Sequence, residues 1–89
     1  MGELRFDPDS LSGISKTEVE RFLEKIQWIW VNRKTINHHP LRHDLSGYCK
    51  RALGKYRIIY SYCESTDEVT IHLVGTRDTI YKDAVKKFR

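Results

Sequence analysis

Cationic residues in the second half of the chain have the spacing of an anion-binding site on a sheet. Gly54-Lys55 separates two runs of strand-forming residues, and glycine at the first central position is typical of a type II′ two-residue hairpin. Residues that face each other across such a hairpin lie side by side on one face. Counting outward from the turn predicts three opposed pairs, which are Leu53 with Tyr56, Ala52 with Arg57, and Lys50 with Ile59.

Alternate residues of a strand point to the same side, so this register divides the hairpin into two faces. The face expected to join the core carries Leu53, Tyr56, Ile58, Tyr60 and Tyr62. The other face carries Lys50, Ala52, Arg57, Ile59 and Ser61. Arg57 therefore lies in mid-strand, points away from the core and has no carboxylate near it in sequence. We interpret it as an anion site, with pairing to a surface carboxylate as the alternative.

Length and composition indicate a single soluble globular domain, residues 1–89, with 39% hydrophobic and 31% charged residues. No apolar run approaches the ~20 residues of a membrane span, and the N-terminus has no apolar region of a signal peptide. Cys49 and Cys63 are expected on opposite faces of the hairpin, which disfavours a disulfide and indicates the reducing cytoplasm. The net charge of +4 permits binding to nucleic acid or to an acidic protein without selecting either.

The first half of the chain predicts a short strand and one long helix. Residues 4–6 have the composition of a strand, ended by Asp7-Pro8, and residues 9–14 predict a helical turn. Ser15-Lys16-Thr17-Glu18 matches the S-x-x-E capping box that starts a helix, and this helix is expected to end within residues 32–35. Its apolar stripe is predicted to consist of Val19, Phe22, Leu23, Ile26 and Trp30.

The second half predicts a loop, three strands and a final helix. Residues 37–47 form the loop, and strands follow at 48–53, 56–63 and 68–75. Asp78 or Thr79 can cap the last helix, in which Tyr81, Ala84, Val85 and Phe88 recur at helical spacing. The order of N-terminal strand, helices, antiparallel β-meander and C-terminal helix predicts a small two-layer α+β domain, with helices covering one face of the sheet.

Histidines raise the question of a metal site. His38, His39 and His43 lie close in sequence, but imidazoles without a cysteine or a matched carboxylate fit zinc ligand spacing poorly, so no metal is expected. His72 is predicted to point away from the face of Ile71 and Leu73 and to share the outward face with Arg57. Its near-neutral reference pKa suits proton transfer, although a spectator on the sheet is the simpler interpretation.

Several segments together resemble the RelE/ParE toxin superfamily of type II toxin–antitoxin systems, over nearly the whole chain. The matching segments are Leu45-Ser46-Gly47, then Gly54-Lys55-Tyr56-Arg57-Ile58-Ile59-Tyr60, then Val74-Gly75-Thr76-Arg77-Asp78, then Ile80-Tyr81-Lys82. The resemblance implies a RelE-like fold, a cytoplasmic toxin that arrests growth, a cognate antitoxin as partner and no cofactor.

The superfamily contains two chemistries on one fold. RelE-like members are ribosome-dependent endonucleases (mRNA interferases), which bind RNA and cut mRNA in the ribosomal A site, whereas ParE-like members inhibit DNA gyrase. The resemblance therefore implies either the ribosome and mRNA or DNA gyrase as target, and an inactive member that only binds antitoxin is a third alternative.

In RelE-like nucleases the comparable catalytic positions correspond here to Lys50, Arg57, Arg77 and Tyr81. Arginine suits the charge that develops on a phosphate, and lysine or tyrosine can transfer protons. Phosphate binding is predicted for Lys50, Arg51, Arg57, His72 and Arg77. The chain departs from the pattern at Ala52, where many members carry a second basic residue. Arg51 is predicted to point to the opposite face unless a bulge shifts the register.

Each candidate also has a structural interpretation. Arg77 could tether the last helix, Tyr81 could serve core packing, and Lys50 could be an ordinary solvated lysine. Trp28 lies off the helix stripe, so it is either an anchor for a partner or partly buried against a neighbouring element. An antitoxin is expected to contact Trp28 and the outward sheet residues around Ile59.

Overall fold

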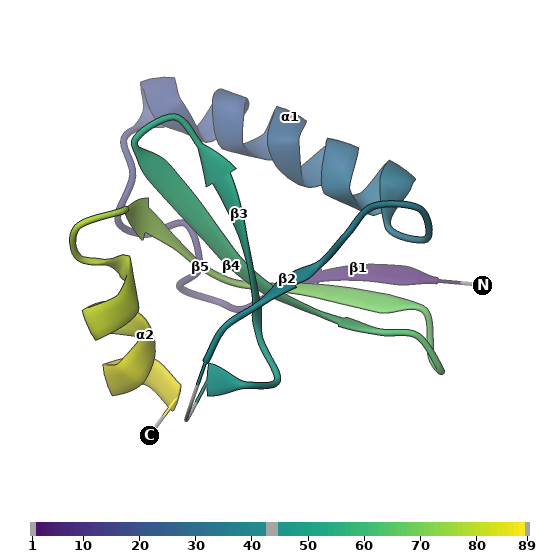
Figure 1. Ribbon diagram of the computed structural model, residues 1–89. Coiled ribbons are helices and arrows are strands. Elements are labelled where there is room, and N and C mark those ends of the chain that lie inside the picture. The colour runs from purple at the N-terminus through teal and green to yellow at the C-terminus, as the bar shows by residue number, and fades with distance from the viewer. Residues whose placement is uncertain (1, 43–44, 89) are drawn as a thin grey trace.

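The computed structural model describes residues 2–42 and 45–88, which form an α+β domain built on one five-stranded sheet (Figure 1). The elements in chain order are β1 (Glu3–Phe6), α1 (Lys16–Asn32), β2 (His39–Pro40), β3 (Cys49–Leu53), β4 (Tyr56–Cys63), β5 (Glu68–Thr76) and α2 (Ile80–Phe88). The described chain has no helix long and apolar enough to cross a membrane.

The sheet is mixed, with strand order β1-β5-β4-β3-β2. The predicted meander of β3, β4 and β5 is confirmed, and β1 pairs with β5 in the parallel sense. The prediction of a plain loop over residues 37–47 is wrong in part, because His39 and Pro40 form β2 and pair with Lys50 and Cys49. Two paired residues leave too short a pattern for a sequence to reveal.

The predicted β3–β4 hairpin is confirmed residue by residue. Leu53 lies opposite Tyr56, and Ala52 lies opposite Arg57. Gly54 has φ +58°, the left-handed conformation that a type II′ turn requires at its first central position and that glycine adopts without strain. This register fixes which side chains share each face of the hairpin.

Helix α1 begins after Ser15, as predicted, but the capping box does not form. The Ser15 hydroxyl makes no cap hydrogen bond and instead lies 3.0 Å from the Thr17 hydroxyl. Glu18 pairs with Arg21 at 3.4 Å. The extended backbone of Ser15 therefore marks the helix start without the side-chain bonds that the motif usually supplies.

The main core lies between α1 and one face of the sheet. It is made of Phe22, Ile26, Ile29, Ile58, Tyr60, Val69, Ile71 and Val74. Leu23, which we assigned to the buried stripe, is 43% exposed, and Ile29 takes the buried position. The stripe was misassigned because a 3.6-residue period fits two neighbouring sets of apolar residues in this helix.

Helix α2 packs against the opposite face of the sheet, so the prediction that helices cover only one face is wrong (Figure 1). Ile80 and Ala84 of α2 form a second core with Ile59, Leu41 and Leu45. Ile59 is fully buried there, which also corrects its assignment as an exposed contact for a partner. The apolar side of α2 needs a surface to cover, and Ile59 provides it at the centre of the sheet.

A β-bulge in β5 places His72. Ile59 pairs with Leu73 but Tyr60 pairs with Ile71, so His72 is an extra residue without an opposed partner. His72 lies on the α2 side, as predicted, in edge contact with Phe88. Leu73 also packs on the α2 side, contrary to the prediction from strict alternation, because the bulge shifts the alternation by one residue.

Candidate functional site

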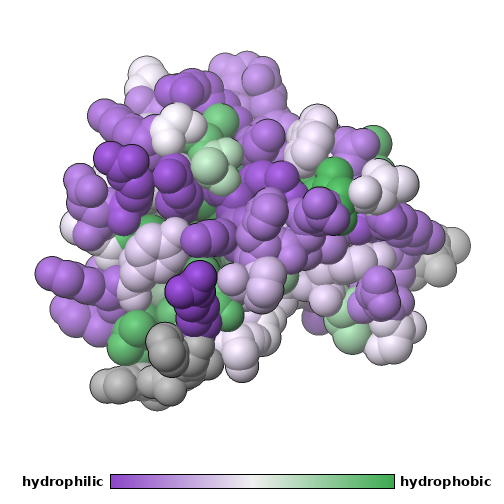
Figure 2. All heavy atoms as spheres, viewed as in Figure 1, coloured by the Kyte–Doolittle hydropathy of each residue, from purple (hydrophilic) through white to green (hydrophobic). Residues whose placement is uncertain are grey.

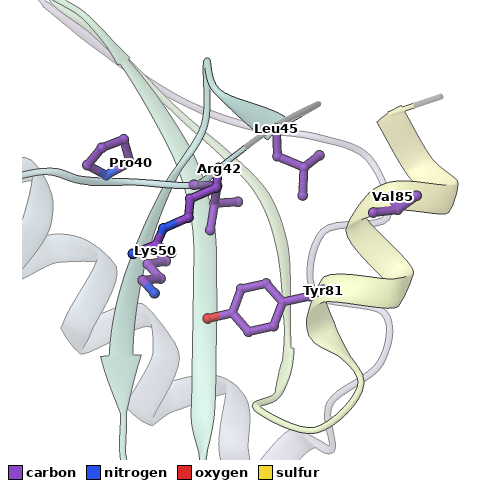
Figure 3. Close-up of a pocket in the computed structure, with 7 residues that line it drawn as sticks. Pro40, Arg42, Leu45, Lys50, Tyr81 and Val85 are labelled. Atoms are coloured by element: carbon purple, nitrogen blue, oxygen red, sulfur yellow. The ribbon is translucent and has the colours of Figure 1, made fainter.

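A cleft of about 370 Å³ opens between the segment after β2, strand β3 and helix α2 (Figure 3). It is lined by Pro40, Leu41, Arg42, Leu45, Lys50, Tyr81 and Val85. Polar side chains dominate the face seen in Figure 2, where apolar patches at lower left coincide with α2 and the segment that follows β2. The cleft thus combines an apolar floor with two cations and one phenol.

Lys50 and Tyr81 are two of the predicted catalytic residues, and the fold brings them together. Lys50 extends from β3 on the α2 side of the sheet, and Tyr81 lies in the first turn of α2. The Lys50 ammonium lies 5.8 Å from the centre of the Tyr81 ring. In Figure 3 the Tyr81 hydroxyl points toward the side of the cleft that holds Lys50 and Arg42.

Arg57 shares this face with Lys50. Because Ala52 opposes Arg57 and Lys50 lies two residues before Ala52, the two cations are diagonal neighbours, about 7–8 Å apart at the backbone. The Arg57 Nη1 group donates to the carbonyls of Gly54, at 2.9 Å, and Tyr56, at 2.7 Å. These bonds turn the guanidinium toward the hairpin turn and leave the Nε and Nη2 hydrogens without a partner in the described chain.

Arg77 lies beside the same hairpin turn. Its backbone N–H donates to the carbonyl of Lys55 at 2.9 Å, and its side chain is exposed. The contact that ties the β5–α2 connection to the hairpin is therefore made by the backbone of Arg77, and the guanidinium takes no part in it. Arg57 and the backbone of Arg77 thus both lie at the hairpin end of the sheet.

The charge on this face is not neutralised by nearby carboxylates. Among residues 2–42 and 45–88, no carboxylate lies within 4.0 Å of Arg42, Lys50, Arg57 or Arg77. Four cations thus surround a cleft and a hairpin end with donors directed toward solvent. Such an arrangement attracts a phosphate group, because charge-assisted hydrogen bonds to an anion would satisfy those donors.

Arg51 does not join this group. Its Nη2 donates to the carbonyl of Asn37 at 2.6 Å, and its guanidinium carbon lies 5.3 Å from the Trp28 ring on the α1 side. The β3–β4 register is regular, so no bulge turns Arg51 toward Lys50. The geometry therefore separates Arg51 from the predicted phosphate-binding set.

His72 occupies the α2 side but is largely enclosed, with 14% of its side chain exposed. One ring nitrogen lies 2.8 Å from the Ser61 hydroxyl and the other 2.8 Å from an Asp7 carboxylate oxygen. The rings of Tyr48 and Phe88 contact it edge-on. The order of carboxylate, imidazole and hydroxyl is that of a hydrolase relay, yet Ser61 lies in mid-strand on β4. We interpret His72 as a structural link rather than a proton donor to RNA.

The end of α2 is anchored by the same cluster. The Lys87 ammonium lies 2.8 Å from Asp9 and 3.3 Å from Asp7, and its hydrogen bond keeps the pKa of Asp9 below the ordinary value. Phe88 stacks on Tyr48 with ring centres 4.0 Å apart. This anchor holds the helix that carries Tyr81. Sequence reasoning missed it because its partners lie at opposite ends of the chain.

His38 and His39, two of the three histidines that lie close in sequence, have separate surroundings. His38 lies 2.6 Å from the Tyr60 hydroxyl and 2.7 Å from the Arg33 carbonyl, so both ring nitrogens are used in the fold. His39 belongs to β2, and His43 lies outside the described residues. In the part of the chain that the structure describes, no three potential metal ligands converge.

Arg42 is a cleft residue that sequence reasoning missed. It lies between a buried leucine and residues outside the described ranges, in a segment that we had treated only as a connection. The one available signal was a cation directly after the apolar Pro40-Leu41 pair. That signal is weak, because cations in loops are common and most are solvated.

Comparison with known proteins supports the resemblance at the level of the fold. No family model and no curated protein matches the sequence. The toxin–antitoxin complex RelBE2 from Mycobacterium tuberculosis contains a chain similar to this one, with 22% identity over 84% of this chain and 96% of that chain and a TM-score of 0.72. The isolated E. coli RelE toxin is 25% identical over 97% of each chain, with a TM-score of 0.64. A YafQ mutant from E. coli is 15% identical over 91% of this chain and 99% of that chain, with a TM-score of 0.65.

The fold and the cleft define a small α+β domain in which a helix closes over a cationic sheet face. Solved structures that share this architecture include the isolated RelE toxin and a RelBE2 toxin–antitoxin complex. The chain therefore has the RelE toxin fold.

Proposed function

We propose that the chain is the toxin of a type II toxin–antitoxin system and that it cleaves mRNA on the ribosome without a metal ion. The observation that carries this proposal is the meeting of Lys50, Arg57 and Tyr81 on one face, with Arg77 at its end and no carboxylate nearby among the described residues. A face of this kind suits the phosphodiester backbone of RNA.

Arg57 and Arg77 would bind the scissile phosphate. Arginine stays protonated and presents a planar set of donors, which can follow the change from a tetrahedral phosphate to a five-coordinate transition state. Two arginines from different elements can contact different phosphate oxygens. Arg42, which lines the cleft beside Lys50, would bind a neighbouring phosphate of the same strand.

Lys50 and Tyr81 would carry out the two proton transfers of the reaction. The RNA 2′-oxygen forms a bond to phosphorus as its proton is removed, and the bond from phosphorus to the 5′-oxygen breaks as that oxygen receives a proton. The products are a 2′,3′-cyclic phosphate and a 5′-hydroxyl. Lys50 and Tyr81 lie close enough to serve the two ends of this in-line path, one as base and one as acid.

The ribosome would supply the substrate geometry. Ala52 stands between Lys50 and Arg57 at the position where many relatives carry a second basic residue, so this site has few groups able to accept a proton. Fixing the 2′-hydroxyl in line with the leaving oxygen lowers the barrier by a large factor without any additional catalytic group. We therefore expect slow cleavage that depends on ribosome-bound mRNA.

The partner would be a cognate antitoxin, and the compartment would be the cytoplasm. Several structurally similar chains come from RelBE toxin–antitoxin complexes. An antitoxin that covers the cationic face would prevent both phosphate binding and entry into the ribosome. No cofactor is needed for the chemistry proposed, since the attacking oxygen belongs to the RNA itself.

The test is controlled expression of the chain followed by primer extension on several abundant mRNAs. The natural chain is expected to arrest growth and to produce new 5′ ends within codons, and Tyr81→Phe is expected to weaken both effects. Intact mRNA in arrested cells, together with loss of gyrase supercoiling activity, would reject the nuclease and favour gyrase inhibition. Growth without arrest would indicate a member that only binds antitoxin.

A further inference from the structure

A second groove lies on the other side of the sheet, between α1 and the tip of the β3–β4 hairpin. It has a volume of about 240 Å³ and is lined by Arg21, Glu24, Lys25, Trp28 and Leu53. Trp28 is 41% exposed, so a large aromatic surface remains in contact with water. In Figure 1 the hairpin tip approaches the N-terminal half of α1, which places this groove away from α2 and the Lys50 cleft.

The groove runs beside a free strand edge. Strand β2 accompanies β3 only at Cys49 and Lys50, and no other strand of the described chain flanks the outer side of β3. In a two-residue hairpin the pair next to the turn is hydrogen-bonded and the following pair is not. Leu53 belongs to the first kind of pair and Ala52 to the second. The N–H and C=O of Ala52 therefore point outward, where no strand receives them.

Cations surround the exposed indole. The Lys25 ammonium lies 4.3 Å from the centre of the Trp28 ring, and the Arg51 guanidinium lies 5.3 Å from it. Arg21 has only a 3.4 Å contact with Glu18 and remains largely exposed. Arg21, Lys25 and Arg51 thus outnumber the two carboxylates nearby, those of Glu18 and Glu24. A partner segment with carboxylate side chains would complement this charge.

We propose that the free edge of β3 and the Trp28 groove together bind an extended, acidic segment of the antitoxin. The segment would add a strand beside β3 through the Ala52 peptide group, insert one apolar side chain against Trp28 and Leu53, and direct carboxylates to Arg21, Lys25 and Arg51. Backbone pairing supplies affinity in this mode, and the groove selects the anchor residue. The identity of the partner rests on the proposed function, whereas the surface itself does not.

The same observations disfavour two other occupants. Single-stranded RNA would need to stack a base face-on over the indole, where Lys25 and Arg51 already lie, whereas an apolar side chain needs only the ring edge. A second copy of this chain would bring Arg21, Lys25 and Arg51 of one groove toward the same cations of the other, in a protein of net charge +4. Like charges directly opposed across a sheet are destabilising.

The experiment measures the dissociation constant of the full chain for the purified product of the adjacent short open reading frame, by isothermal titration calorimetry. Trp28→Ala is expected to weaken binding at least about 10-fold, because buried tryptophans dominate such interfaces. Ala52→Pro removes the outward N–H without touching the β3–β4 ladder and is expected to weaken binding about 3-fold or more. Leu23→Ala removes an exposed leucine about 140° around α1 from Trp28 and should change binding less than 2-fold.

Hydrogen exchange of the natural complex provides a second measurement that does not depend on any variant folding. The Ala52 amide is expected to become protected when antitoxin binds. Tight binding with an unprotected Ala52 amide and an unchanged dissociation constant for Trp28→Ala would overturn this inference and leave the proposed function standing. Failure of the adjacent gene product to bind at all would overturn the proposed function. Equal protection by a polyuridine oligonucleotide would reassign the groove to RNA.

Discussion

Two regions of this molecule hold arginines in opposite circumstances. At the end of α1, Arg33 donates from Nε and Nη2 to both carboxylate oxygens of Asp67, at 2.7 and 2.8 Å. Its Nη1 donates to the Trp30 carbonyl at 2.8 Å, and its guanidinium lies 3.7 Å from the Trp30 ring centre. On the α2 face, Arg57 and Arg77 have no carboxylate partner among the described residues. All the hydrogen bonds of the Arg33 side chain are made within the fold, whereas Arg57 and Arg77 have N–H donors that a ligand could use.

The Arg33–Asp67 pair closes a turn that several elements share. Asp67 has φ +55°, accepts a hydrogen bond from the Tyr62 hydroxyl at 3.1 Å, and receives the backbone N–H of Glu3 at its own carbonyl. The hydrogen bonds from Arg33 hold the pKa of Asp67 far below its ordinary range. The comparison teaches that the environment of an arginine, and not its presence, separates a structural role from a binding role.

Replacing Arg57 is expected to have the largest effect on activity. Arg57→Ala should lower mRNA cleavage at least about 100-fold, because a donor aimed at developing phosphate charge is lost. The free energy of unfolding should fall by less than about 1.5 kcal/mol, since only two hydrogen bonds to backbone carbonyls disappear. Toxicity in cells and urea unfolding of the purified protein measure the two quantities. A fully toxic Arg57→Ala variant would remove the anion-site interpretation of this face.

Arg77 should have a smaller effect that depends on shape as well as charge. Arg77→Ala is expected to reduce cleavage about 10-fold, and Arg77→Lys should recover only part of it, because lysine keeps the charge but loses the planar donor set. The backbone bond to Lys55 survives both changes. If Arg77→Lys is as active as the natural chain, only the charge at this position matters. An equal loss of Tm in Arg77→Ala and Arg77→Lys would favour a role of Arg77 in tethering the helix.

Substitutions in the Arg33–Asp67 pair should lower stability and leave activity intact. Asp67→Asn keeps a residue that tolerates positive φ but loses the charge that pairs with Arg33, so Tm should fall while toxicity persists. The Tm of Asp67→Ala should fall further, because alanine is strained at this φ and cannot accept the hydrogen bond from the Tyr62 hydroxyl. Calorimetric melting of the three proteins gives the order. Loss of cleavage in a folded Asp67→Asn protein would connect the two regions and contradict their separation.

The Arg33–Asp67 pair should also make stability depend on pH, and this is the smallest of the expected effects. Because the pKa of Asp67 is lower in the folded chain than the ordinary value of about 4, its carboxylate stabilises the fold above that pH. The contribution is lost as the pH falls below about 4 toward the folded-state pKa. The difference in unfolding free energy between the natural chain and Asp67→Asn should therefore be constant near neutrality and shrink in acid. A difference that grows in acid would contradict the ion pair.

Local rules were enough to predict one face of the site. The turn at Gly54 fixes the register of β3 and β4, and the register alone places Lys50 and Arg57 on one side and Arg51 on the other. Strand composition and helix periodicity located every long element. These features depend on neighbours within a few residues, which the sequence displays directly.

The remaining parts of the site depend on contacts between distant segments. Tyr81 lies near Lys50 because α2 packs on that side of the sheet. The sequence around Ile59 does not indicate that a helix covers it. The bulge places His72 against Ser61 of β4 and Asp7, which lies just after β1. Arg42 lies in the cleft close behind β2, whose pairing with β3 the sequence did not reveal. Tertiary packing, rather than local propensity, determined each of these.

The most direct test of the central claim, that the unpaired cations of the α2 face cleave mRNA on the ribosome, is an assay with purified components. The chain and its Arg57→Ala variant are incubated with programmed ribosomes and with naked mRNA, the naked mRNA also in EDTA, and products are mapped by primer extension. The account predicts metal-independent cuts in the mRNA of programmed ribosomes and little cutting of naked mRNA by the natural chain. The Arg57→Ala variant should cut neither RNA. Efficient cutting of naked mRNA, or equal cutting by Arg57→Ala, would contradict it.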